Sequence, residues 1–111
     1  MNRIVMSSAA AALLRALIAR AGVTRDRILL TDVQSVDWQS LTLAGERHHF
    51  SLRASGSDSS AVAGRMCNGL SDAEFSIPGV IVADINVLEG PERALDGSTT
   101  LTIEALTIRE D

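Results

Sequence analysis

Two aspartates in similar surroundings are the residues whose spacing most resembles a catalytic arrangement. Asp32 and Asp84 each follow an apolar run, Ile28 to Leu30 in one case and Val80 to Val82 in the other. Two carboxylates that face one another can work as a general acid and a general base. No nucleophile or histidine stands at a supporting spacing. Charged residues on strands also discourage edge-to-edge aggregation, and we expect Asp32 and Asp84 to have this role.

The positions of the two histidines and of the cysteine argue against a metal site. His48 and His49 are adjacent, so on a strand their side chains face opposite sides of the sheet and cannot chelate one ion. We expect His48 to be half-buried and His49 to be exposed. Cys67 is the one cysteine of the chain, which excludes an internal disulfide and a thiolate zinc cluster. We expect it to be a structural, apolar thiol, and we expect no cofactor.

A serine- and glycine-rich loop, residues 55–60, precedes an expected helix and superficially resembles a phosphate cradle. The loop lacks the lysine of a Walker motif, and Asp58 would repel an anion. Helix capping is therefore the better interpretation. The chain also contains no CxxC, GxGxxG or HExxH motif, and its motifs indicate no characterised family. These absences favour a protein that is not an enzyme, and an enzyme built around Asp32, Asp84 and His49 is the least favoured of three interpretations.

Length and composition indicate how many domains the chain forms and which classes of partner are disfavoured. The chain has 111 residues, with 14 acidic and 10 basic side chains and an apolar fraction of 46%. This length and composition predict one folded domain over residues 1–111. The net charge of −4 argues against nucleic acid or an anionic membrane as a partner. Arg15 and Arg20 interrupt the apolar N-terminal stretch that follows Met1 to Arg3, so we expect a cytoplasmic protein without a signal peptide.

Periodicity and turn residues predict the order α-β-β-α-β-β. A helix is expected to begin at Ser7 or Ser8 and to end at Gly22. The second helix is expected over residues 60–70. The first strand is expected over residues 28–36 with a continuation through 41–43, and a turn at 44–46 leads to the second strand over 47–54. The third and fourth strands are expected over residues 80–88 and 99–108.

The two halves of the chain resemble each other at a displacement of 52 residues. The displacement aligns Ser7 with Ser59, Asp32 with Asp84, and Gly45 with Gly97. This pattern predicts a duplicated αββ unit, with pseudo-repeats over residues 7–54 and 59–108. Two such units predict an α+β, two-layer sandwich. Its four-stranded antiparallel sheet has both helices on one face. One arrangement with this order of elements is a permuted ferredoxin-like fold, with the second strand of each hairpin in the centre.

Alternation along the strands predicts which side chains face the helices. The alternation in the third strand directs Ile81, Ala83, Ile85 and Val87 to the helices, and the repeat assigns Leu29 and Val33 to the same layer. The opposite, open face then receives both charged and aliphatic residues, a mixture too apolar for a fully solvated surface. Trp38 is an expected interface anchor. The interface candidates are Ile28, Leu30, Asp32, Trp38, Arg53, Val80, Val82, Asp84 and Glu104.

These features predict a non-enzymatic module that associates with itself, or with another protein, through the open face. A twofold contact could bring Arg53 of one copy to Glu104 or Asp84 of another. The alternative is a regulatory domain that binds a small molecule at the pseudo-twofold axis or between subunits.

Overall fold

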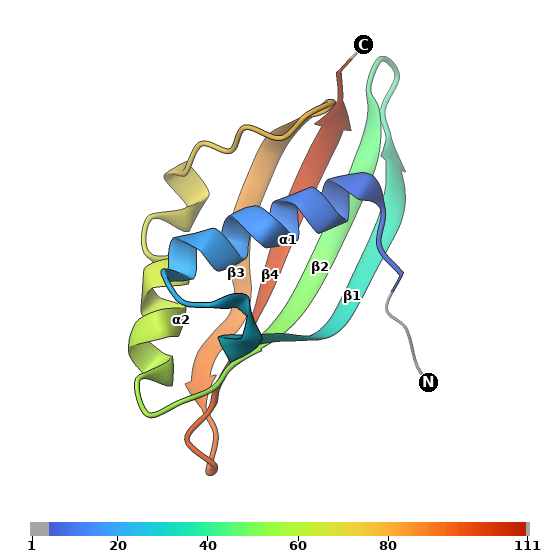
Figure 1. The fold of residues 1–111 in the computed structure, drawn as a ribbon. Coiled ribbons are helices and arrows are strands. Elements are labelled where there is room, and N and C mark those ends of the chain that lie inside the picture. Colours follow the sequence, from blue (N-terminus) through green and yellow to red (C-terminus); the bar gives the residue numbers. More distant parts are fainter. Residues whose placement is uncertain (1–4, 111) are drawn as a thin grey trace.

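Four antiparallel strands form one sheet in residues 5–110, the part of the chain that the computed structural model describes. The strands are β1 (Ile28–Gln39), β2 (Ala44–Ala54), β3 (Val80–Arg93) and β4 (Thr99–Arg109). Their order in the sheet is β1-β2-β4-β3, so the second strand of each hairpin lies in the centre (Figure 1). The predicted α+β class and strand order are confirmed. The basic start of the chain, Met1 to Arg3, lies outside the described residues.

Two helices, α1 (Ser8–Ala21) and α2 (Ser59–Cys67), cover one face of this sheet (Figure 1). The Ser7 hydroxyl accepts a hydrogen bond from the Ala10 N–H at 3.2 Å and caps α1. Gly22 ends α1 with φ of 70°, the left-handed conformation that glycine adopts without strain. The second helix is shorter than predicted. It ends at Cys67 and is followed by a 3₁₀ turn over Leu70–Asp72.

Arginine side chains tie the C-terminal ends of the two helices together. Arg65 of α2 donates from Nε to the Ala21 carbonyl at 2.9 Å. Arg20 of α1 donates in return to the carbonyls of Met66, at 3.2 Å, and Asn68, at 2.6 Å. A guanidinium near the negative end of a helix satisfies carbonyls that have no partner within the helix. The helix pair is thus fixed as a unit above the sheet.

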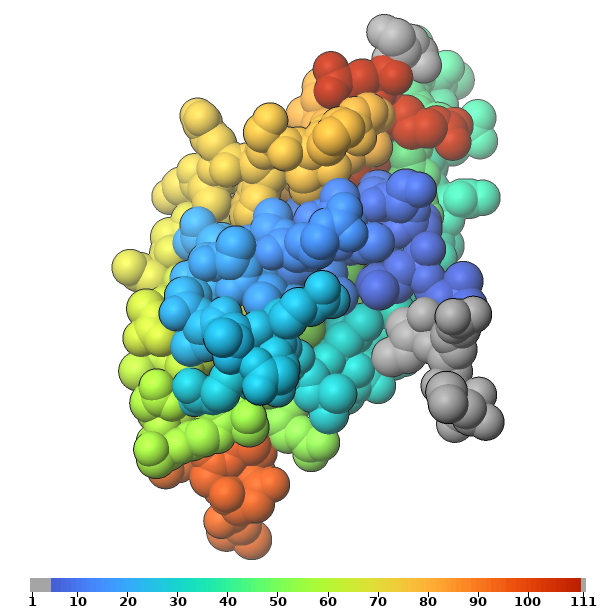
Figure 2. Space-filling view, viewed as in Figure 1, coloured from blue at the N-terminus to red at the C-terminus, as the bar shows by residue number. Residues whose placement is uncertain are grey.

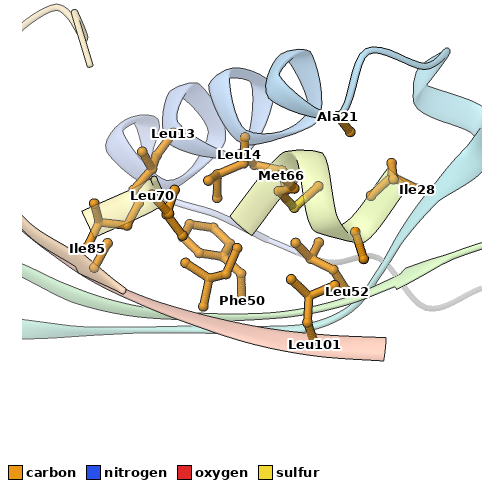
Figure 3. Close-up of a cluster of buried hydrophobic side chains, with 14 of the residues drawn as sticks. Leu13, Leu14, Ala21, Ile28, Phe50, Leu52, Met66, Leu70, Ile85 and Leu101 are labelled. Carbon is orange, nitrogen blue, oxygen red and sulfur yellow. The ribbon is translucent and has the colours of Figure 1, made fainter. Parts of the chain in front are cut away.

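The hydrophobic core fills the space between the two layers. Leu13 and Leu14 of α1 point down toward Phe50 and Leu52 of β2 (Figure 3). Phe50 has no exposed surface and Leu52 has 1%. The space-filling view shows this side of the sheet covered by helices and loops, while the β3–β4 hairpin projects beyond them (Figure 2).

A β-bulge in each edge strand changes which side chains face the core. The register with the neighbouring strand shifts between Leu30 and Asp32 in β1, and between Val82 and Asp84 in β3. The extra residue reverses the alternation on one side of each bulge. The predicted face is therefore correct from Val33 onward in β1 and for Ile85 and Val87 in β3. It is wrong before each bulge, where Leu29 and Ile81 lie on the side away from the helices. Four predicted open-face residues instead lie on the helix side, with Ile28 buried and the others partly buried: Ile28, Leu30, Val80 and Val82.

The hairpin turns also differ from the prediction. The first turn lies at residues 40–43 rather than 44–46, because the Ser40 hydroxyl accepts the Leu43 N–H and the Ser40 N–H donates to the Leu43 carbonyl. Gly45 consequently lies within β2, opposite Trp38, whereas Gly97 lies in the turn after β3. These two glycines are not structurally equivalent. The two bulges do fall at the residues that the 52-residue displacement aligns, and the pseudo-repeats themselves remain a prediction.

Candidate functional site

The sheet face opposite the helices carries no covering element among residues 5–110. The register of the strands arranges its side chains in rows that cross all four strands. One row contains Gln34, His49, Glu104 and Asn86, in the order of the strands. We call this surface the open face. It is the candidate functional site, because the opposite face is filled by the core.

An ion network occupies the centre of the open face. Glu104 of β4 accepts from Arg47 of β2 at 3.2 Å through Oε1, and its Oε2 lies 2.6 Å from His49 Nε2. The Glu104 side chain is 22% exposed, so the network is partly shielded from water. Glu104 is therefore engaged by its own chain and is not a free carboxylate available to another copy.

Apolar side chains lie together at one end of the open face. The row there consists of Trp38, Gly45, Ile108 and Ile81, in the order of the strands. Because Gly45 has no side chain, none separates Trp38 from Ile108 in this row. Ile81 is 56% exposed, and Val36 in the next row is 63% exposed, whereas Trp38 is half-buried and Ile108 is buried beneath its neighbours in the row. We call these residues, Val36, Trp38, Ile81 and Ile108, the apolar end.

Charges of opposite sign are divided between strands on the open face. Arg47, which is paired with Glu104 in the ion network, and Arg53, which lies beyond the network, are both on β2. The carboxylates Asp84, Glu89 and Glu92 lie along β3, at the opposite side of β4. Arg53 and these three carboxylates form no ion pair within residues 5–110. The open face thus has a basic strip and an acidic strip.

The structure brings only some of the predicted site residues together. Asp32, Trp38, Arg53, Asp84 and Glu104 face the open side, as their register shows. Asp32 and Asp84 lie on the two edge strands, separated by β2 and β4, which is roughly 14 Å across the sheet. They are too far apart to share a proton or one substrate bond. The other four candidates, the helix-side residues described above, contribute little or nothing to this surface.

His48 forms a buried polar cluster beneath the sheet that the sequence does not reveal. It is fully buried rather than half-buried, and its ring stacks on Phe50 with centroids 5.9 Å apart. Nδ1 lies 2.7 Å from Ser35 Oγ, and Nε2 lies 2.8 Å from Thr107 Oγ1. Burial lowers the pKa of His48, while the Glu46 carboxylate acts in the opposite direction. Both ring nitrogens have hydroxyl partners, so the neutral ring is satisfied in place.

The free energy of unfolding should therefore fall as pH drops below about 6.5, the ordinary pKa of histidine in an unfolded chain. Below that pH His48 binds a proton in the unfolded chain but stays neutral in the folded protein. The free energy of unfolding therefore falls by up to about 1.4 kcal/mol for each pH unit, until His48 is also protonated in the folded state. Urea melts between pH 5 and 7.5 measure this slope. His48→Gln should show a smaller slope than the wild type over the same range, and equal slopes would contradict this role for His48.

The described residues offer little else for chemistry. Within residues 5–110, no three His, Cys, Asp or Glu side chains converge to hold a metal ion. None of the helices described there has both the length and the apolarity needed to cross a bilayer. A pocket of about 220 Å³ lies at the turn over residues 40–43, beside Arg109, and one of about 100 Å³ opens between Ser51 and Glu89. Both are smaller than the roughly 300–1,000 Å³ that is usual for small-molecule sites.

Comparison of the chain with known protein families, curated proteins and solved structures finds no significant match. A function is therefore inferred from the geometry of the open face.

Proposed function

We propose that the protein is a non-enzymatic self-association module that pairs with a second copy through its open face. The observation that carries this proposal is the uncovered sheet face, with its apolar end and its separate charged strips. Apolar surface gathered in one patch is characteristic of interaction surfaces. The face measures roughly 19 Å by 30 Å, so two stacked copies bury roughly 1,200 Å², the lower bound for a stable interface.

The charge strips favour one orientation of the two copies. A twofold axis parallel to the strands, between the stacked sheets, places β2 of one copy over β4 of the other. Arg53 then lies close to Glu92 of the second copy, and Arg47 lies close to its Asp84, with each contact made twice. An axis across the strands would place arginines over arginines. Such exposed pairs contribute only about 0–1 kcal/mol each, so they select orientation while the apolar end supplies most of the affinity.

Ile81→Asp should weaken this self-association. Ile81 is 56% exposed in the described chain, so the substitution is compatible with folding, but in the complex it places an unpaired carboxylate against Trp38 of the second copy. The dissociation constant should rise at least about tenfold, which corresponds to about 1.4 kcal/mol. Sedimentation velocity over a concentration series measures the change.

Leu41→Asp is the matched control. Leu41 is fully exposed, but it lies in the turn at residues 40–43 and outside the rows of the open face. This variant should associate as the wild type does. Equal weakening by both substitutions would contradict the proposal. Substitutions at Leu30 and Val82 are unsuitable here, because both side chains pack against the core.

The alternative of a regulatory domain that binds a small molecule receives no comparable support. The pocket of about 100 Å³ is lined by the hydroxyls of Ser51 and Thr102 and by the carboxylates of Glu89 and Glu92. The pocket at the first turn, about 220 Å³, is also below the usual size of a small-molecule site. Self-association therefore remains the function that the geometry supports best.

A further inference from the structure

The two edges of the sheet differ in how well they can accept another strand. The β3 edge is interrupted by three register shifts and by Pro91, which has no N–H, and it carries Asp84, Glu89 and Glu92. Beyond its bulge, β1 runs from Asp32 to Gln39 in unbroken register with β2. This stretch contains no proline and no basic residue, and its charged side chains are Asp32 and Asp37. A long, regular edge of this kind is a template for strand addition.

The hydrogen bond at the first turn shows which backbone groups of this edge do not pair with β2. The Ser40 N–H donates to the Leu43 carbonyl at 2.9 Å, which makes Ser40 and Leu43 a hydrogen-bonded pair. Hydrogen-bonded and non-hydrogen-bonded pairs alternate along an antiparallel ladder. Even-numbered residues from 32 to 38 therefore bond to β2. The odd-numbered residues point their N–H and carbonyl groups outward: Val33, Ser35, Asp37 and Gln39.

We propose that the β1 edge binds the β1 edge of a second copy, antiparallel, about a twofold axis at Val36. This register pairs Val33 with Gln39 and Ser35 with Asp37 of the other copy, so every outward-facing residue is used and about eight backbone hydrogen bonds form. A shift by two residues in either direction would leave one outward residue of each copy unpaired.

The side chains of β1 are complementary in the same register. Val36, which is 63% exposed, lies directly opposite Val36 of the second copy and becomes covered. Asp37 lies beside the hydroxyl-bearing Ser35, so no like charges stand opposite each other. This self-complementarity identifies a second copy as the occupant of the edge. The result is one continuous eight-stranded sheet with all four helices on the same side.

This contact differs from the proposed contact between open faces, although the side chains of Val36 and Trp38 take part in both. It has a different axis, perpendicular to the sheet, and uses backbone groups that the open face does not present. A chain that uses both contacts forms assemblies larger than a dimer.

Cysteine cross-linking tests the register directly. The test uses Val36→Cys in a Cys67→Ser background, so that no other thiol competes. Residues in a non-hydrogen-bonded pair have Cα atoms about 4.5 Å apart, which permits a disulfide. We expect mild oxidation to convert most of this variant to a covalent dimer on a non-reducing gel. Gln34→Cys in the same background is the matched control, because it lies on the same strand and face but opposite Trp38, and it should remain largely uncross-linked.

The outcomes separate this inference from the proposed function. Stacked open faces alone place Val36 near Asp84 of the other copy, so they produce no Val36–Val36 disulfide. Adding Ile81→Asp to the Val36→Cys chain should leave the cross-link intact while weakening the open-face contact. Equal cross-linking at residues 34 and 36, no cross-linking at either, or loss of the cross-link on adding Ile81→Asp would overturn the inference.

Discussion

Phe50→Ala is expected to lower the free energy of unfolding by about 3–5 kcal/mol, a large fraction of the stability of a small domain. Phe50 has no exposed surface and lies on central strand β2, where its ring supports both the His48 ring and the leucines of α1 (Figure 3). Because the helices are fixed to one another by Arg20 and Arg65, they cannot easily move to fill the cavity. Urea-induced unfolding followed by circular dichroism measures the loss.

Phe75→Ala is the matched control for this prediction. Phe75 is only partly buried and lies in the connection that leads to β3. The same truncation should therefore cost clearly less stability than at Phe50. A similar cost at both positions would show that Phe50 is not the centre of the core.

Gly45→Ala is the second substitution for which we expect a large effect. A Cβ atom at Gly45 would lie 1.9 Å from the Thr107 carbonyl oxygen and 2.9 Å from Ile108 Cα. These are backbone atoms of β4, paired with β2 at this point, so the strain cannot be relieved by a side-chain movement. The cost should be at or above the upper end of the range of about 1–3 kcal/mol that is typical of overpacking.

Gly64→Ala is the matched comparison, and we expect it to change the stability in the opposite direction to Gly45→Ala. A Cβ atom at Gly64 would meet nothing within 4 Å, and the residue lies inside helix α2. Alanine should therefore stabilise the protein by about 0.5–1 kcal/mol through its higher helix propensity. Thermal melts of the two variants should move in opposite directions, and a mild effect of Gly45→Ala would contradict the close approach of β2 to β4.

The fold was predictable because the signals for its elements are local. Ser7 and Gly22 bound the first helix, and alternating apolar residues define the central strands, on which Phe50 and Leu52 are buried. The order of elements then leaves few ways to bury both helices on one sheet.

The faces of the edge strands were less predictable, for a physical reason. The runs from Ile28 to Leu30 and from Val80 to Val82 are apolar at every position, so either alternation places an apolar residue in the core. The bulges after these runs determine which residues of the runs face the core, and the bulges form through pairing with β2 and β4. The ion network and the Ser35–His48–Thr107 cluster likewise join residues from different strands, whose proximity requires the register.

Sedimentation equilibrium of the full chain tests the central claim, self-association, most directly. The mass of one chain is 11.8 kDa. The weight-average mass should rise with concentration across the micromolar range and reach at least twice that value. Self-association through the open face predicts that Ile81→Asp shifts this rise to higher concentration, whereas Leu41→Asp leaves it unchanged. A mass that stays at 11.8 kDa over the whole range would contradict the account.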